Sequence, residues 1–154
     1  MKRVLFVCTG NICRSPTAEA ILRKHAKEQG LDVVVDSAGT HGYHIGEAPD
    51  PRSVKAGARR GYDLSTIRAR KITREDFERF DYLIALDEGH LALMQAACPV
   101  GLQHKLHAMM VFAPQLGYSE VPDPYYGPAA GFEQVIDLLE AATTGLVKTL
   151  LHKA

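Results

Sequence analysis

The chain has 154 residues, 23% of them charged, and its 18 Lys and Arg residues equal its 18 Asp and Glu residues in number. This length predicts one domain over residues 1–154, with enough buried apolar surface to need neither a metal ion nor a disulfide. A formal charge of zero argues against a general binder of nucleic acid, although it leaves room for a local basic pocket. Three cysteines are too few for the disulfide framework of a small secreted protein.

The N-terminal residues are charged and then apolar, but the apolar run covers only residues 4–8. Gly10 and Asn11 follow it closely, so we expect neither a signal peptide nor a membrane span there. The expectation is a cytoplasmic enzyme or binding domain that makes no contact with a membrane.

Short apolar runs alternate along the chain with stretches of helical periodicity. In chain order they predict a strand at 4–7, a helix at 16–29, a strand at 33–35, a helix from 51 to about 60, a short helix that begins at the capping box of residues 73–76, a strand at 82–86, a helix from about 87 to 97, a strand within 106–112, and a helix from 132 to the C-terminus. This alternation predicts the α/β class: a three-layer fold with a central, mostly parallel four-stranded sheet flanked by helices.

Local signals mark several of these boundaries. Ser15 is expected to cap the first helix, with Pro16 at its first position and Gly30 at its end. Thr73 and Asp76 have the spacing of a capping box. Residues 37–51 are rich in glycine and proline, and a loop of this length in a compact domain often carries function.

The first loop lies between a strand and a helix and reads Cys8-Thr9-Gly10-Asn11-Ile12-Cys13-Arg14-Ser15. Backbone N–H groups at such a turn, with a helix dipole behind them, form a nest for a tetrahedral dianion. Arg14 can add a forked hydrogen bond to two oxygens of the same anion. The same positive field favours the thiolate form of Cys8, to which Ser15 is placed to donate.

The other residues of this loop are candidate substrate-binding residues: Thr9, Gly10, Asn11, Ile12, Cys13 and Ser15. Gly10 is expected to let the backbone turn tightly, and Asn11 to accept a left-handed conformation and pin the loop. The alternative is that Cys8 is a small buried residue at a strand end and Arg14 an ordinary surface charge. The Ser-Pro helix start favours the functional interpretation, and the loop lacks the Gly-Lys-Ser/Thr of a nucleotide phosphate loop.

Taken together, five segments resemble the low-molecular-weight protein tyrosine phosphatases, in order and over essentially the whole chain: residues 8–16, 37–40, 50–52, 69–70 and 123–126. The resemblance implies a single domain of this family that acts on phosphotyrosine-containing proteins. Its catalytic residues would be Cys8, Arg14 and Asp123, and its reaction would pass through a cysteinyl-phosphate without a metal ion or other cofactor.

Asp123 precedes Pro124, and on the residues alone the pair is an Asp-Pro turn. The resemblance makes Asp123 the general acid for the leaving phenol and then the base for water. Tyr43, Tyr125 and Tyr126 are candidate walls of the substrate pocket, with ordinary packing as an equal alternative. The resemblance also suggests that the tyrosines after Asp-Pro can be phosphorylated.

Two positions depart from the family pattern. Ile67 stands where a histidine is frequent, which places a polar network through this position in doubt, and His90 stands where an asparagine is common. Cys13 is expected either to trap oxidised Cys8 as a disulfide or to be a buried structural thiol, and Cys98 to be structural. The seven histidines show no zinc pattern, so no metal site is expected.

Other functions fit the sequence less well. A thiol-linked arsenate reductase shares the fold and loop but needs further redox cysteines, and only Cys98 lies downstream. A protein arginine phosphatase typically has a smaller threonine at the position of Ile12, which here favours a phenol. A phosphate-binding module without activity would need neither Cys8 nor Asp123. The oligomeric state is left open.

Overall fold

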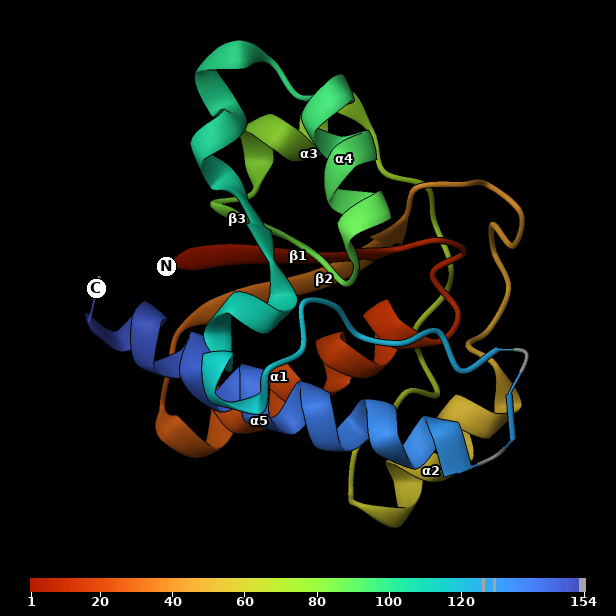
Figure 1. The fold of residues 1–154 in the computed structure, drawn as a ribbon. Coiled ribbons are helices and arrows are strands. Elements are labelled where there is room, and N and C mark those ends of the chain that lie inside the picture. Colours follow the sequence, from red (N-terminus) through yellow and green to blue (C-terminus); the bar gives the residue numbers. More distant parts are fainter. Residues whose placement is uncertain (126, 129, 153–154) are drawn as a thin grey trace.

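The computed structural model of the chain describes residues 1–125, 127–128 and 130–152 (Figure 1). Four parallel strands form one sheet in the order β2-β1-β3-β4. The strands are β1 (Lys2–Cys8), β2 (Val33–Gly39), β3 (Tyr82–Ala85) and β4 (Leu106–Ala108). The predicted four-stranded sheet is therefore confirmed, and all of its pairings are parallel.

Helices cover both faces of this sheet, which makes three layers (Figure 1). One face packs against α1 and α5, with α2 beside them, and the other carries α3 and α4. The α-helices in the described residues are α1 (Arg14–Gln29), α2 (Pro51–Arg59), α3 (Arg74–Arg79), α4 (Glu88–Ala97) and α5 (Ala130–His152). Within the described residues, no helix has both the length and the apolar character needed to cross a bilayer.

The central strand β1 supplies apolar side chains to two separate cores. Val4 and Phe6 point into the cluster formed with α1 and α5, whereas Leu5 and Val7 point into the cluster formed with α3 and α4. All four side chains are fully buried. Alternate residues of a strand face opposite sides of its sheet, so a continuous apolar run is what a strand covered on both faces requires.

Most of the predicted boundaries are confirmed, and two are corrected. Gly30 ends α1 in a left-handed conformation (φ 65°), and Thr73 forms the capping box with Asp76. Ser15, however, does not cap α1, and Pro16 is not at its first position: the helix begins at Arg14, and both residues are buried in its first turn.

The fourth strand is shorter than the 106–112 segment in which it was predicted. It ends at Ala108, and Met109–Phe112 form a 3-10 helix, η2, that contacts α5. Met109 and Met110 are buried there, so burial against a helix ends the strand.

The long loop after β2 is held to the first loop at both ends. Near its start, the Thr40 N–H donates to the Cys8 carbonyl oxygen at 2.8 Å and the His41 N–H donates to that of Thr9 at 3.0 Å. At its end, the Asp50 N–H donates to the Ile12 carbonyl oxygen at 2.8 Å. These bonds position the 40–50 loop as one wall beside the end of β1.

Candidate active site

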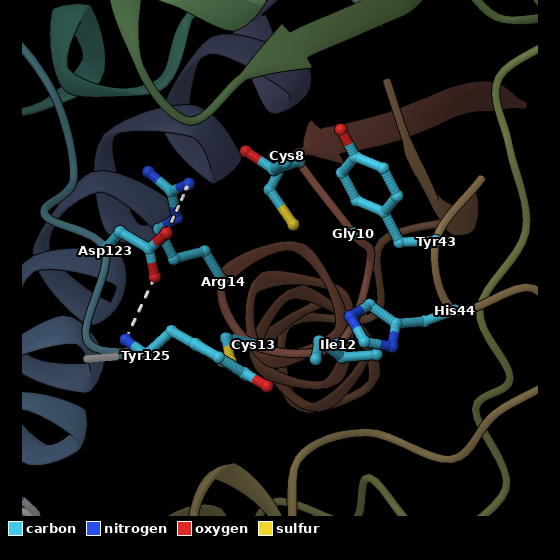
Figure 2. A pocket seen from close by; sticks show the side chains of 10 residues that line it. Cys8, Gly10, Ile12, Cys13, Arg14, Tyr43, His44, Asp123 and Tyr125 are labelled. Atoms are coloured by element: carbon cyan, nitrogen blue, oxygen red, sulfur yellow. Dashed lines mark hydrogen bonds and ion pairs between the residues drawn. The ribbon is translucent and has the colours of Figure 1, made fainter. Parts of the chain in front are cut away.

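A pocket of about 250 Å³ opens at the C-terminal end of β1, where α1 begins (Figure 2). Nine of its ten lining residues were predicted from the sequence, namely Cys8, Thr9, Gly10, Ile12, Cys13, Arg14, Tyr43, Asp123 and Tyr125. The tenth is His44, which sequence analysis did not assign to the site. Tyr126, also predicted there, lies outside the described residues. In parallel α/β sheets, ligands bind at this edge because loops from several strands converge there.

Cys8 lies at the bottom of the pocket with a hydroxyl group beside its sulfur. The Cys8 Sγ is 2.9 Å from the Ser15 Oγ, and both residues are buried. The Ser15 Oγ in turn accepts a hydrogen bond of 2.8 Å from the Asn11 amide. Because the Ser15 oxygen accepts this bond from Asn11, its hydroxyl hydrogen is free to point at the Cys8 sulfur. A hydroxyl group in this orientation stabilises a thiolate.

Asn11 secures the loop from behind rather than lining the pocket. It is the one described non-glycine residue with a positive φ, 60°, and its side chain is buried. Its amide nitrogen also donates to the Ser37 Oγ at 2.9 Å, while its carbonyl oxygen accepts from the Arg70 N–H at 3.0 Å. Asparagine tolerates the left-handed region better than most side chains, so this residue supplies both the turn and its anchor.

The polar network continues to a buried carboxyl group. Ser37 donates to Glu19 Oε1 at 2.5 Å, and Arg23 forms an ion pair with the same carboxyl group. Burial raises the pKa of Glu19, although the bonds from Ser37 and Arg23 oppose that shift. Ile67, at the position where the family often has a histidine, is instead a core residue. The network therefore passes through Glu19 and the backbone of Arg70.

Arg14 enters the pocket from the first residue of α1 and is held from behind. Its Nη1 donates to Asp87 Oδ2 at 2.9 Å and to the Val121 carbonyl oxygen at 3.0 Å, and only 3% of its side chain is exposed. Burial alone would raise the pKa of Asp87, but the His90 N–H and the Arg14 guanidinium outweigh burial and lower it. Asp87 is therefore a fixed anion that orients the guanidinium.

Asp123 lies across the pocket mouth from Tyr43 (Figure 2). Its Oδ2 is 3.6 Å from the Arg14 Nη2, and its Oδ1 accepts from the Tyr125 N–H at 3.0 Å. Arg52 in α2 holds this segment by donating to the Tyr125 carbonyl oxygen at 2.9 Å, with its guanidinium 5.5 Å from the Tyr125 ring centre. The carboxyl group is 44% exposed, so water and substrate both reach it.

Gly10 provides space for the His44 side chain rather than an unusual backbone angle. A Cβ at this position would lie 2.8 Å from the Cδ2 of His44, closer than real side chains approach. Gly10 does not have a positive φ. The absence of a side chain therefore lets the 40–50 loop close over the first loop and bring Tyr43 and His44 to the pocket.

His90 also supports the first loop, through the side chain of Thr9. Its Nε2 is hydrogen-bonded to the Thr9 Oγ1 at 2.7 Å, and its Nδ1 is 3.1 Å from Asp87 Oδ1 without hydrogen-bond geometry. Burial lowers the pKa of His90 to about 4, against the attraction of the Asp87 charge. The ring is therefore neutral at pH 7 and acts as a hydrogen-bonding group.

Cys13 lines the same pocket as Cys8 but differs from it in setting. Burial, followed by the charge of Asp50, raises the pKa of Cys13 to about 12, so it stays a protonated thiol at pH 7. All three cysteines are free thiols, and Cys98 packs in the core between the sheet and α4. A disulfide between oxidised Cys8 and Cys13 stays a prediction.

Asp87 and Val121 were the contacts that sequence analysis did not connect with Arg14. They are 73 and 107 residues away from it along the chain. One usable signal was present: Asp87 follows strand β3, the neighbour of β1, and C-terminal ends of adjacent parallel strands meet at one edge. Over the described ranges, no group of three or more His, Cys, Asp or Glu side chains is arranged to hold a metal ion.

Comparison with known proteins identifies the family of the chain. The family model for Low molecular weight phosphotyrosine protein phosphatase matches residues 3–154. The low molecular weight protein-tyrosine-phosphatase of Streptomyces coelicolor is 45% identical over 150 residues, which cover 94% of this chain and 91% of that protein. The human low molecular weight phosphotyrosine protein phosphatase is 44% identical over 138 residues, with 87% and 86% covered.

A solved structure shows the same fold. The crystal structure of a protein tyrosine phosphatase from Entamoeba histolytica superposes with a TM-score of 0.96 and 41% sequence identity, covering 99% of each chain. The sheet, the loop between β1 and α1, and the sequence likeness over the whole chain thus point to one conclusion. The chain belongs to the low molecular weight protein tyrosine phosphatase family and is a hydrolase of the phosphatase class.

Proposed function

We propose that the protein hydrolyses phosphotyrosine in other proteins through a cysteinyl-phosphate intermediate. The observation that carries this proposal is the convergence of a buried Cys8 sulfur, the Arg14 guanidinium and the Asp123 carboxyl group on one pocket. A nucleophile, an anion-binding fork and a proton donor are the three groups that cleavage of an aryl phosphate requires.

In the first step, the Cys8 thiolate attacks the phosphorus atom. A sulfur–phosphorus bond forms while the bond from phosphorus to the phenolic oxygen breaks, and Asp123 gives its proton to that oxygen. Arg14 and the N–H groups of the loop stabilise the equatorial oxygens. The contact of Arg14 with Asp87 and Val121 leaves its second nitrogen, Nη2, facing the pocket beside Asp123.

In the second step, water replaces sulfur on phosphorus. Asp123, now a carboxylate, takes a proton from the water as the sulfur–phosphorus bond breaks, and inorganic phosphate leaves. The Ser15 hydroxyl, 2.9 Å from the Cys8 sulfur, stabilises the departing thiolate. Both steps use only side chains of this protein and water, so the proposal includes no cofactor.

The walls of the pocket favour a substrate whose leaving group is aromatic. Ile12 lines one side, and the rings of Tyr43 and Tyr125 lie on opposite sides of the opening (Figure 2). Apolar and aromatic walls accept a flat phenyl ring, and Ile12 disfavours the charged guanidinium of phosphoarginine. We assign Thr9, Gly10 and Cys13 to the pocket lining, and Asn11 and Ser15 to the support of the loop. Tyr126 stays a prediction.

The proposal extends to the setting of the enzyme. Residues 1–154 act as one phosphatase domain, and phosphotyrosine-containing proteins are its partners. Three buried free thiols are in keeping with a reducing compartment, and we place the protein in the cytoplasm.

Steady-state kinetics on matched peptides test the proposal. Peptides of one sequence that carry phosphotyrosine, phosphoserine or phosphoarginine are compared without added metal. We expect kcat/KM to be highest for phosphotyrosine, and a phosphorylated Cys8 to be trapped by acid quenching. Cys8→Ser should abolish turnover but retain phosphate binding, because the loop and Arg14 remain. Equal rates on the three peptides, or turnover by Cys8→Ser, would contradict the proposal.

A further inference from the structure

A second hollow is lined by residues of α3, of α4 and of the segments next to them. Figure 1 shows α3 and α4 together on one face of the sheet. The volume of the hollow is about 470 Å³, and we call it the α3–α4 groove. The lining residues that matter for its chemistry are His41, Lys71, Arg74, Phe77, Leu93 and Ala97. The reaction proposed above uses none of these side chains.

The groove has an apolar floor that is open to solvent. Phe77, Met94 and Cys98 are buried at its base, whereas Leu93 of α4 is 49% exposed. Ala97, one helical turn after Leu93, is exposed as well. An exposed leucine in a hollow lined by apolar side chains favours binding of another apolar side chain there.

The rim of the groove is basic. Lys71 and Arg74 are exposed, and neither forms an ion pair with any residue in the described part of the chain. The described lining includes no Asp or Glu side chain. Two unpaired cations beside an apolar hollow complement a ligand that combines apolar and acidic groups.

The groove and the active-site pocket share a boundary. His41 lines the groove and Tyr43 lines the pocket, and their rings stack with centres 5.1 Å apart and an interplanar angle of 11°. The backbone of His41 is bonded to Thr9 in the first loop. A polypeptide whose phosphotyrosine enters the pocket can therefore pass over this ring pair into the groove.

We propose that the α3–α4 groove binds the substrate polypeptide next to its phosphotyrosine, taking an apolar side chain onto Leu93 and Ala97 and an acidic side chain between Lys71 and Arg74. The inference rests on the proposed function, because the phosphotyrosine anchors the peptide. It adds a sequence preference: the enzyme distinguishes phosphotyrosine sites by an apolar and an acidic neighbour. Free phosphotyrosine is too short to reach the groove.

Kinetics on a peptide set test this preference. Each peptide carries one phosphotyrosine and places a Leu-Glu pair at one position within five residues on either side, since five extended residues span about 17 Å. Matched peptides carry Ala-Lys at the same position. We expect the best Leu-Glu peptide to exceed its Ala-Lys partner about tenfold in kcat/KM, the effect of burying part of one leucine side chain. The two peptides should differ in KM and not in kcat, because the groove contacts form when the substrate binds and do not change in the chemical step.

Variants of the enzyme test whether the preference for the Leu-Glu peptide depends on the α3–α4 groove. Ala97→Trp fills the groove, and Lys71→Glu reverses its charge; each should remove the preference while free phosphotyrosine is still hydrolysed. Ala96→Trp on α4 and Arg79→Glu on α3 are the controls, because both residues are exposed but do not line the groove. They should retain the preference.

The outcomes separate this inference from the proposed function. Hydrolysis of free phosphotyrosine without any preference among the peptides would overturn the groove proposal and leave the proposed function standing. Equal loss of preference in Ala97→Trp and Ala96→Trp would overturn it as well. A wild-type enzyme inactive on every phosphotyrosine peptide and on free phosphotyrosine would contradict the proposed function, and the groove proposal with it.

Discussion

Arg14 illustrates how a charged side chain is prepared for binding an anion. Its Nη1 is occupied by Asp87 and Val121, so the guanidinium plane is fixed and Nη2 points to the pocket. A buried cation is tolerated because the Asp87 carboxylate compensates its charge. The rotational freedom of a long side chain is thus lost during folding and not during substrate binding.

Replacement of Arg14 by lysine should therefore impair both binding and catalysis. Lysine keeps the charge but cannot bond Asp87 and two phosphate oxygens in one plane. We expect kcat/KM for phosphotyrosine to fall by about 10²–10³, the usual cost of one lost transition-state donor. Initial rates and the Kd for inorganic phosphate measure the effect, with Arg59→Lys on the surface of α2 as control. Near-normal kinetics would remove Arg14 from the mechanism.

Asp123 allows a test that separates chemistry from structure. Asp123→Ala should slow phosphotyrosine hydrolysis by about 10²–10⁴-fold, the range for general acid catalysis. The loss should shrink for aryl phosphates with more acidic phenols, because these leave without a proton. Plots of rate against the pKa of the phenol, for wild type and variant, measure this. Parallel plots would show that Asp123 acts only through the turn in which its Oδ1 accepts from Tyr125.

Among the helices, α5 is positioned by a glycine at its contact with η2. A Cβ at Gly145 would clash with the carbonyl oxygen of Phe112. Both partners are backbone in packed elements, so neither a rotamer change nor a small shift relieves the contact. The close approach lets η2 pack on the helix and bury Met109 and Met110.

Gly145→Ala should consequently destabilise the fold despite the better helix propensity of alanine. We expect the free energy of unfolding to fall by about 3 kcal/mol, the upper end for overpacking. Urea titration followed by circular dichroism measures this. Gly101→Ala is the control, because a Cβ there meets no atom within 4 Å. If Gly145→Ala unfolds at the same urea concentration as the wild type, η2 and α5 can move apart without loss of stability.

For the molecule as a whole, His90 makes stability depend on pH. Its pKa is lowered from 6.5 to about 4 by burial, so between these values the unfolded chain binds a proton that the folded chain does not. Stability contributed by the neutral ring is complete above pH 6.5 and is lost as pH falls towards 4. The loss approaches about 3 kcal/mol, because each unit of pKa difference corresponds to about 1.4 kcal/mol.

His90→Asn removes this titration and leaves a polar side chain at the position. We expect the wild type to lose more stability than the variant between pH 6.5 and 4, measured as unfolding midpoints at each pH. Groups common to both proteins, including Glu19 with its raised pKa, cancel in the difference. If the unfolding midpoints of the wild type and the variant change equally between pH 6.5 and 4, His90 is not buried in its neutral form.

The parts of this protein that follow from the sequence are those set by short-range contacts. The run of residues 4–7 is apolar at every position, and such a short run is typical of a strand covered on both faces. Gly30 and the capping box at Thr73 act within one helical turn, so their signals are readable in the chain. The Cys-to-Arg loop is also local, and it contains six of the ten residues that line the pocket.

The tertiary structure decided what distant segments do to one another. Ser15 has the sequence of a helix cap, yet it is bonded to Cys8 and Asn11 because the loop folds back over the first turn of α1. The fourth strand ends early because η2 packs on α5. Asp87 and Val121 reach Arg14 only because parallel strands bring their C-terminal ends, and the loops that follow, to one edge of the sheet. These contacts depend on three-dimensional proximity, and the spacing between the residues along the chain does not by itself identify them.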